Sequence, residues 1–444
     1  MDAREVALLT LNACERQGGW SDGVLKKQIA AAGLDSRDAG LATQLCFGVI
    51  QNRILLDFYL SKFSNIPLRR LEGKVLQALR LGLYQMLFLT RIPHSAAVDQ
   101  SVALTRAHCK NPRAPGMVNA ILRNLERSLD RLPTIPEDDP AEYYATLYSH
   151  PVWLVRELLE TLGSEGTAAF LQADNSQPPI TAMVNTVKTD LEGALEALQA
   201  EGVHGEPHPW LKNCLVLSRS GSLEELDAFR NGLFYVQDPA SRLAVMALDP
   251  EPGSRVLDMC AAPGGKSFAA AIQMKDQGEI WSCDLHPHKK TLIQKGAQRL
   301  GLTCIRPQTA DGKVRRPEWE GAFDRVLVDA PCSGLGVIRK KPDIRFKDPE
   351  PLAGLPQVQS AILDNAAGYV KPGGVLVYST CTILERENRA VTDAFLAAHP
   401  EFRRERFLLP GPAGEDPGGQ ITLWPQVHGT DGFYICKLRK DGEA

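Results

Sequence analysis

One stretch narrows the possible folds of this chain more than any other. It spans residues 254–267 and reads Ser-Arg-Val-Leu-Asp-Met-Cys-Ala-Ala-Pro-Gly-Gly-Lys-Ser. Val256 and Leu257 end a short apolar run that is typical of a buried strand, and Asp258 lies at its carboxyl end. Small residues and two glycines follow, and after Lys266 the pattern becomes helical. A strand, a glycine-containing turn and the start of a helix predict the first βα unit of a nucleotide-binding sheet.

Two ligand-binding motifs that this turn lacks limit the kinds of ligand that it can bind. It is not G-x-G-x-x-G, and Cys260 stands where the first glycine of a phosphate-binding G-x-x-x-x-G-K-[ST] loop belongs. A dinucleotide or a triphosphate is therefore disfavoured. Small residues let the backbone approach a ligand, and the helix N-terminus offers free N–H groups to a carboxylate. S-adenosylmethionine (SAM) suits such a turn, although an ordinary tight βα turn has the same local pattern.

The alternation of strands and helices continues from residue 236 onward. Further strands are predicted at 279–283, 303–305, 325–328, 375–378 and 433–438. Acidic or nucleophilic side chains lie at or just past the carboxyl ends of the strands, namely Asp258, Asp284, Asp311, Asp329 and Cys381. Open α/β sheets bind ligands at this edge, and an acid about 20 residues past the glycines, as Asp284 is, is placed to bond ribose hydroxyls.

The N-terminal part of the chain has a different character. Apolar side chains at helical spacing predict an all-helical region over 1–130, and the proline-rich acidic stretch 132–141 predicts a linker to a small α+β region. Residues 1–127 carry 17 Lys and Arg against 10 Asp and Glu, a balance of +7, whereas the whole chain has −3. Such an excess favours a polyanionic partner, although a solvated helical surface with no partner has the same composition.

Several classes of protein are disfavoured by the sequence. No run of 18 apolar residues exists, and the N-terminus does not resemble a signal peptide. The ten cysteines are spread singly without a C-x-x-C pair, which argues against a zinc site and indicates free thiols in a reducing cytoplasm. We therefore expect a cytoplasmic protein without a metal.

Two cysteines follow predicted strands, Cys332 and Cys381. A cysteine in such a place is often an inert small apolar residue. A methyl transferase has a specific use for thiols, because C5 of a pyrimidine is a poor nucleophile. A thiolate that adds to C6 makes C5 reactive toward the SAM methyl group, and a second group must then assist loss of the C5 proton.

Three motifs carry a resemblance to a known family. Asp258–Lys266, Asp329–Gly334 and Ser379–Cys381 together resemble the RNA 5-methylcytosine methyltransferases of the Fmu/Sun class, across about residues 232–440. Other stretches fit the same resemblance: 237–241 and 431–434 in the catalytic part, and 91–94 and 119–123, which look like the NusB-type RNA-binding domain. The fusion of these two domains is typical of enzymes that act on small-subunit ribosomal RNA.

The resemblance implies an α/β fold. A Rossmann-like SAM-dependent methyltransferase domain, at 236–444, would be preceded by an all-α NusB-like domain at 1–131 and a small α+β RNA-binding region at 142–235. The implied activity is methylation of C5 of a cytosine in 16S ribosomal RNA through a covalent Cys–C6 adduct. The implied partner of this monomer is small-subunit rRNA, either naked or partly assembled.

The resemblance also implies roles for individual residues. Cys381 would be the nucleophile, Cys332 would assist proton removal and release, and Asp329 would contact the cytosine beside the methyl donor. The SAM site would consist of Cys260, Ala261, Ala262, Pro263, Gly264, Gly265, Lys266, Asp284 on the ribose, Asp311 at the adenine, and Asp329. A basic run after Cys332 is a candidate clamp for RNA phosphates or, alternatively, a solvated loop; it is made of Arg339, Lys340, Lys341 and Arg345.

Two other interpretations stay open. The same fold could methylate another RNA, such as a tRNA, or a protein, but a protein-glutamine enzyme would have no use for Cys381. A non-enzymatic RNA-binding assembly factor would not need both cysteines together with the predicted SAM acids. A methyl-transfer assay with identification of the product base separates these alternatives.

Overall fold

The computed structural model describes residues 1–17, 20–218, 221–416 and 418–442. The chain forms two compact units, which are described separately below. The first, the helical unit, contains residues 1–176 and 341–347, and the second, the catalytic unit, contains residues 177–340 and 348–444. The chain therefore passes from one unit to the other at 176–177, 340–341 and 347–348. The predicted boundaries at 131, 142 and 235 remain predictions.

Over the described residues of 1–130, the regular elements are all helices, as the apolar spacing predicted. The main helices of the helical unit are α1 (Ala3–Gln17), α2 (Ser21–Ala32), α3 (Ser36–Gln51), α4 (Arg53–Phe63), α5 (Gly73–Phe88), α6 (His94–His108), α7 (Ala114–Arg127), α8 (Pro140–Leu147) and α9 (Val152–Asp174). Helix α5 is buried nearly all round, which is typical of the central helix of a bundle. The short 3₁₀ turn η5 (Pro342–Phe346) also belongs to this unit.

A small antiparallel sheet opens the catalytic unit. Its strands are β1 (Ile180–Val184), β2 (His204–Pro207), β3 (Cys214–Ser218) and β4 (Phe234–Val236), in the order β2-β3-β1-β4. Helix α10 (Leu191–Ala200) packs its apolar face on this sheet through Ala194 and Leu198. The predicted small α+β region is thus present.

The main sheet of the catalytic unit has the strand order β10-β14-β9-β8-β5-β6-β7, with β13 paired to β14. These strands are β5 (Arg255–Asp258), β6 (Glu279–Asp284), β7 (Ile305–Thr309), β8 (Phe323–Asp329), β9 (Val370–Thr380), β10 (Phe402–Arg404), β13 (Gln420–Leu423) and β14 (Phe433–Lys440). Strands β5 to β9 pair in parallel, and β14 pairs antiparallel to β9. Strand β5 lies between β6 and β8, where the strand order reverses and such sheets bind ligands.

The strand predicted at 303–305 is wrong in its bounds, because β7 begins only at Ile305. The reason is a side-chain contact that the apolar pattern does not show. The carboxylate of Asp276 accepts the backbone N–H groups of Thr303 and Cys304 at 2.8 and 2.9 Å, so these N–H groups bond to a side chain and not to a neighbouring strand.

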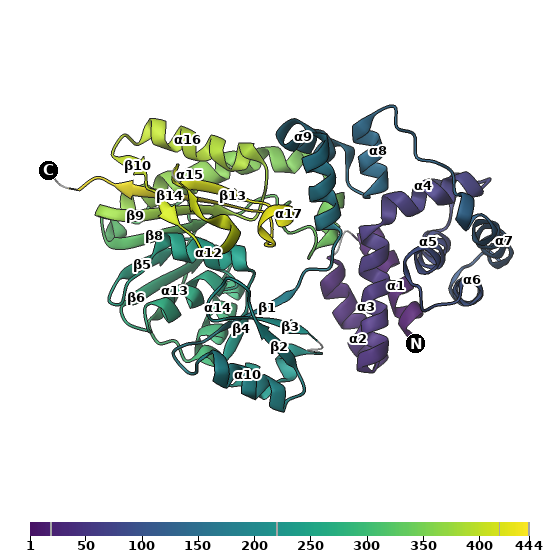
Figure 1. Ribbon diagram of the computed structural model, residues 1–444, viewed down its shortest axis with the longest axis horizontal. Helices are drawn as coiled ribbons and strands as arrows, with labels where there is room; N and C mark the ends of the chain where they lie inside the picture. The colour runs from purple at the N-terminus through teal and green to yellow at the C-terminus, as the bar shows by residue number, and fades with distance from the viewer. Residues whose placement is uncertain (18–19, 219–220, 417, 443–444) are drawn as a thin grey trace. The chain divides into compact units, whose positions relative to one another are not determined.

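Helices cover both faces of this sheet (Figure 1). Helices α12 (Pro239–Leu248), α13 (Gly265–Gln273) and α14 (Pro287–Leu300) pack on one face, whereas α15 (Leu355–Tyr369) and α16 (Arg389–Ala398) pack on the other. Strand residues alternate between the two cores: Val256 belongs to the first and its neighbour Leu257 to the second. This arrangement confirms the predicted α/β class.

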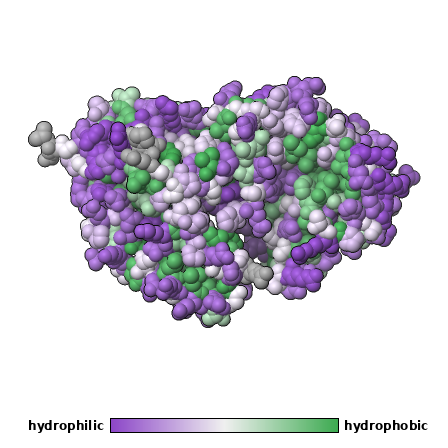
Figure 2. Space-filling view, viewed as in Figure 1, coloured by the Kyte–Doolittle hydropathy of each residue, from purple (hydrophilic) through white to green (hydrophobic). Residues whose placement is uncertain are grey.

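The surface of both units mixes polar and apolar side chains. Figure 2 shows hydrophilic residues spread over the visible face, with hydrophobic patches between them. Among the helices formed by the described residues, none has the length and apolar character needed to cross a bilayer.

Candidate active site

The predicted site residues come together at one edge of the main sheet. Strands β5, β6 and β8 end at Asp258, Asp284 and Asp329, and Cys381 directly follows β9. The parallel register pairs Asp258 with Ser282 and Asp329 with Ser379. Because the carboxyl ends of parallel strands meet at the same edge, the acids and the cysteine share one side of the sheet.

The two predicted cysteines face one another. The Sγ atoms of Cys332 and Cys381 lie 3.2 Å apart, within hydrogen-bond range, and both thiols are free. The hydrogen bond from Cys332 lowers the pKa of Cys381, and the nearby Lys266 ammonium acts in the same direction. The same hydrogen bond, together with burial, raises the pKa of Cys332 well above its usual range. The arrangement favours a thiolate on Cys381 and a proton on Cys332.

Lys266 and Asp329 form an ion pair beside the cysteines. The Lys266 Nζ lies 2.6 Å from the Asp329 carboxylate, whose other oxygen accepts the hydroxyl proton of Ser379 at 2.8 Å. Burial alone would lower the pKa of Lys266, but the Asp329 carboxylate outweighs it and raises that pKa. Lys266, which we expected to line the SAM site, is therefore held as a cation against Asp329.

Asp258 is buried at the base of the turn. Its side chain accepts the Ser267 hydroxyl at 2.7 Å, and the Ser282 hydroxyl in turn donates to Ser267 at 2.7 Å. Burial raises the pKa of Asp258 to about 7. Its Oδ1 atom is buried without a hydrogen-bond partner among the described residues. An unsatisfied buried carboxylate oxygen is costly, so Asp258 has a reason to bond a ligand or hold a proton.

The turn itself requires its glycines. Gly264 has φ 112°, a conformation that disfavours other residues, and a Cβ atom there would lie 2.4 Å from the Phe268 ring. The N–H of Ala261 donates to the Cys283 carbonyl at 2.7 Å, which ties the turn to the end of β6. Helix α13 begins at Gly265, so its first N–H groups are directed toward this edge of the sheet.

Asp284 is the last residue of β6, and Asp311 lies in the loop after β7. The Asp284 carboxylate is buried, accepts the N–H of His286 at 3.0 Å and lies 3.4 Å from the Lys289 Nζ. Asp311 is half-buried and accepts the N–H of Lys313 at 2.9 Å. Both acids thus lie at or just past the ends of their strands, in the positions that the sequence indicated, and Lys289 is an addition that spacing alone did not suggest.

Glu387 is a functional candidate that sequence reasoning missed. This fully buried carboxylate accepts the N–H of Ser333 at 2.9 Å and the amide of Gln359 at 2.8 Å. The same Gln359 amide donates to the Pro331 carbonyl at 3.0 Å. The residues on both sides of Cys332 are therefore fixed by one buried pair. In the sequence, Glu387 lies in a charged stretch after Cys381, residues 385–389, and such a stretch predicts a solvent-exposed loop.

The predicted phosphate clamp is wrong for Arg339 and Arg345, whose side chains are buried, and the structure pairs Lys340 with carboxylates of the same unit. Arg339 pairs with Asp431 at 2.8 Å, and Lys340 pairs with Asp238 and Asp431 at 2.5 and 2.7 Å. Burial and the neighbouring Asp238 raise the pKa of Asp431 to about 6. Arg345 is fully buried in the helical unit, whereas Lys341 is exposed. Arg339, Lys340 and Arg345 are bonded to carboxylate and carbonyl oxygens of the protein itself. A count of basic residues in the sequence does not reveal such pairing.

Comparisons with known proteins agree with this architecture. The family model described as "16S rRNA methyltransferase RsmB/F" matches residues 245–439, "NusB family" matches 1–127, and "Methyltr_RsmF/B-like, ferredoxin-like domain" matches 150–224. The solved structure titled "Crystal Structure of PH0851" is 26% identical, with a TM-score of 0.81 and 99% of each chain covered.

Curated relatives match over nearly the full length. The "Probable ribosomal RNA small subunit methyltransferase B" of Bacillus subtilis (strain 168) is 40% identical, with 99% of each chain covered. The "Ribosomal RNA small subunit methyltransferase B" of Klebsiella pneumoniae is 34% identical, over 92% of this chain and 91% of that relative. The chain therefore belongs to the ribosomal RNA small subunit methyltransferase B family, and is an rRNA methyltransferase.

Proposed function

We propose that this enzyme uses SAM to methylate C5 of a cytosine in 16S rRNA, through a covalent bond between Cys381 and C6. The observation that carries the proposal is the pair of thiols 3.2 Å apart, with the Lys266–Asp329 ion pair beside them. An enzyme that methylates an exocyclic nitrogen or a ribose hydroxyl has no need of two adjacent thiols at this edge of the sheet.

The residues around the turn fit the methyl donor. The unpartnered Oδ1 of Asp258, the close backbone at Gly264 and the start of α13 together offer polar contacts for an amino acid moiety. Asp284 ends β6 and Asp311 follows β7, where they would hold the ribose and the adenine. SAM supplies an electrophilic methyl group when it is bound there.

The cysteines then perform separate tasks. The Cys381 thiolate adds to C6 of the cytosine, which makes C5 a nucleophile for the methyl group. Asp329, held by Lys266 and Ser379, would contact the cytosine as a hydrogen-bond acceptor, and the Lys266 ammonium would stabilise the negative charge that develops on the ring. Once Cys332 has released its own proton to water, its thiolate takes the C5 proton, the C5–H electrons form the C5–C6 double bond, and the bond between Cys381 and C6 breaks to release the methylated base and the Cys381 thiolate.

The RNA requires more than the catalytic edge. A cytosine in folded rRNA must be unstacked before it can reach a thiolate, and a pocket for one base reads little sequence. We infer that residues 1–127, the basic part of the helical unit, bind the surrounding RNA through its shape and phosphates. A monomer that acts in the cytoplasm on naked or partly assembled small-subunit rRNA is part of the same proposal.

The test is methyl transfer from labelled SAM to unmodified 16S rRNA and, separately, to tRNA, followed by identification of the modified nucleoside. We expect 5-methylcytidine in 16S rRNA. Cys381→Ser should abolish the signal, and Cys109→Ser, which changes a half-buried cysteine of the helical unit, should not. Label in tRNA alone, or a product other than 5-methylcytidine, would overturn the proposal.

A further inference from the structure

The segment 341–347 belongs to the helical unit, although it interrupts the part of the chain that forms the catalytic unit. Its residues pack with 1–176, although the residues before and after it belong to the catalytic unit. The segment directly follows the loop that carries Cys332 and ends with the ion-paired Arg339 and Lys340. A short stretch of chain therefore connects a catalytic residue with the helical unit by covalent continuity.

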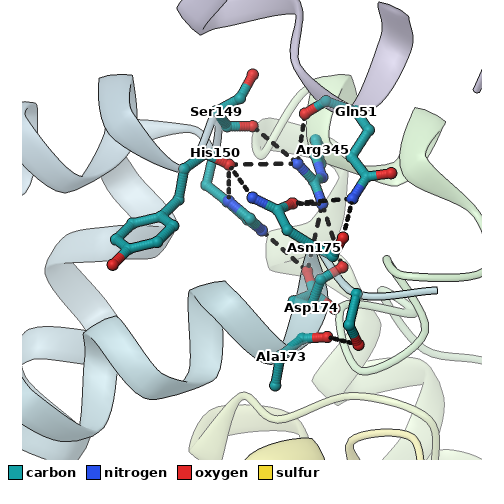
Figure 3. Close-up of polar contacts among 9 residues, drawn as sticks. Gln51, Ser149, His150, Ala173, Asp174, Asn175 and Arg345 are labelled. Carbon is teal, nitrogen blue, oxygen red and sulfur yellow. Dashed lines mark hydrogen bonds and ion pairs between the residues drawn. The ribbon is translucent and has the colours of Figure 1, made fainter. Parts of the chain in front are cut away.

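Arg345 is the centre of this segment, and Figure 3 shows its contacts. Its Nη1 donates to the main-chain oxygens of Gln51 at 2.7 Å and Ser149 at 3.2 Å. Its Nη2 donates to the Asn175 side chain at 2.5 Å and to the Asp174 main-chain oxygen at 3.4 Å. The side chain has no exposed surface.

These partners are the C-terminal ends of three helices. Gln51 is the last residue of α3, Asp174 is the last residue of α9, and the chain at Ser149 leaves α8. Helix C-termini leave carbonyl groups unpaired and carry partial negative charge, so a cation is favourable there. One guanidinium from the 341–347 segment thus donates hydrogen bonds to the C-terminal ends of three helices of the helical unit.

The charge of Arg345 is also balanced inside this unit. The Asp174 carboxylate lies 3.8 Å from its Nη2 and 2.9 Å from Nε2 of His150. Burial and the Arg345 charge lower the pKa of His150 to about 4, so this histidine is neutral at pH 7. Asp174 therefore has Arg345 as a cationic partner, and loss of the guanidinium would remove that positive charge from beside a buried carboxylate.

Neighbours of Arg345 attach the segment at further points. Asp343 accepts the Ser21 hydroxyl at 2.6 Å, and the Arg53 guanidinium lies 3.3 Å from the centre of the Phe346 ring. Asp343 and Phe346 also line a cavity of about 360 Å³ together with residues of α1, α3 and α5. The segment is thus built into the helical unit rather than resting on its surface.

We propose that Arg345 is a positioning residue, which fixes the loop carrying Cys332 to the helical unit so that RNA held by that unit presents its cytosine to the two thiols. This inference rests on the proposed function. Where this loop ends, just before the 341–347 segment, Arg339 and Lys340 are anchored within the catalytic unit by Asp238 and Asp431. The loop is therefore held at its end by buried charges, and the chain beyond it by Arg345.

The test compares two substrates: whole 16S rRNA, which needs the helical unit, and a short single-stranded oligonucleotide that contains the target cytosine. Arg345→Met should slow single-turnover methylation of 16S rRNA by on the order of 100-fold, the effect of a misplacement of about 1 Å. It should leave the oligonucleotide rate and the SAM affinity within about twofold. Arg345→Lys should recover part of the loss, and Arg403→Met, at an exposed arginine of β10 in the catalytic unit, should change nothing.

A second variant covers the case in which Arg345→Met does not fold. Gly-Gly-Ser insertions after Lys340 and after Lys347 slacken the connection while Arg345 keeps its contacts, and should cause the same selective loss on 16S rRNA. Equal losses on both substrates, or no loss on either, would overturn the inference.

Hydrogen exchange of the wild-type protein and Arg345→Met separates this inference from the proposed function. We expect faster exchange over 332–347 in the variant, with 254–267 unchanged. If the wild-type protein methylates neither RNA, the proposed function fails, and unchanged exchange over 332–347 would contradict the anchoring itself.

Discussion

The Sγ atom of Cys332 lies 3.2 Å from the Sγ atom of Cys381, although the two residues follow different strands of the sheet. Strands β8 and β9 pair in parallel, so their carboxyl ends bring the two loops to one place. The hydrogen bond between the thiols makes them unequal, because it lowers the pKa of Cys381 and raises that of Cys332. Nucleophile and proton-bearing group are thus distinguished before any substrate binds.

Lys266→Met should shift the pH dependence of methylation. The Cys332 hydrogen bond and the Lys266 ammonium both lower the pKa of Cys381, so loss of the ammonium raises that pKa. Because the thiolate is the reactive form, the acidic limb of the single-turnover rate against pH should move to higher pH. Lys371→Met, which removes a lysine paired with Asp324, is the control and should leave the limb in place. An unshifted limb in Lys266→Met would contradict the electrostatic role.

Asp258→Asn should change how stability depends on pH. Burial raises the pKa of Asp258 to about 7 from 3.8, so the folded state binds the proton more tightly than the unfolded state. This contribution to stability is present below pH 3.8 and is lost as the pH rises through about 7, with a magnitude on the order of 4 kcal/mol. Asparagine cannot ionise and should remove this loss.

The measurement for Asp258→Asn is urea unfolding of both proteins without SAM, at about pH 5 and about pH 8. The free energy of unfolding of the variant relative to the wild-type protein should increase between the two values. A constant difference would show that Asp258 keeps an ordinary pKa in the folded protein.

Asp284→Ala should weaken SAM binding. A charged hydrogen-bond partner of the ribose contributes about 1.5–3 kcal/mol, which corresponds to roughly 10-fold to 100-fold in affinity. Calorimetric titration with SAM measures the change directly, and Glu318→Ala, at an exposed acid of the catalytic unit, serves as the control. Equal affinity of the Asp284 variant and the wild-type protein would exclude Asp284 from the cofactor site.

The sequence was sufficient to predict which residues lie at the ligand-binding edge of the sheet, because the acids and cysteines lie at or just after the ends of apolar strands. A residue next to a strand end inherits its place from the strand, as Asp284 and Asp329 do. Contacts between side chains far apart in the chain carry no such signal. The Lys266–Asp329 ion pair and the Glu387 carboxylate on the Ser333 N–H depend on how the loops fold over the sheet.

For Arg345, the sequence led to a prediction that the structure contradicts. A basic run predicts a solvated or phosphate-binding loop, since exposed cations are the common case. Here the chain makes an excursion into the helical unit, where three helix ends provide carbonyl oxygens for one guanidinium. Only the tertiary structure reveals that the unpaired carbonyls and the arginine meet.

The central claim, that the two thiols have different roles, is tested most directly by a denaturing gel of each cysteine variant after reaction with 16S rRNA and SAM. In Cys332→Ala the nucleophile is present and elimination is slow, so a denaturant-resistant adduct with methylated RNA should accumulate through Cys381. Cys381→Ala should form no adduct and no product. An adduct in Cys381→Ala with none in Cys332→Ala would reverse the two roles, and full activity of both variants without any adduct would contradict the covalent mechanism.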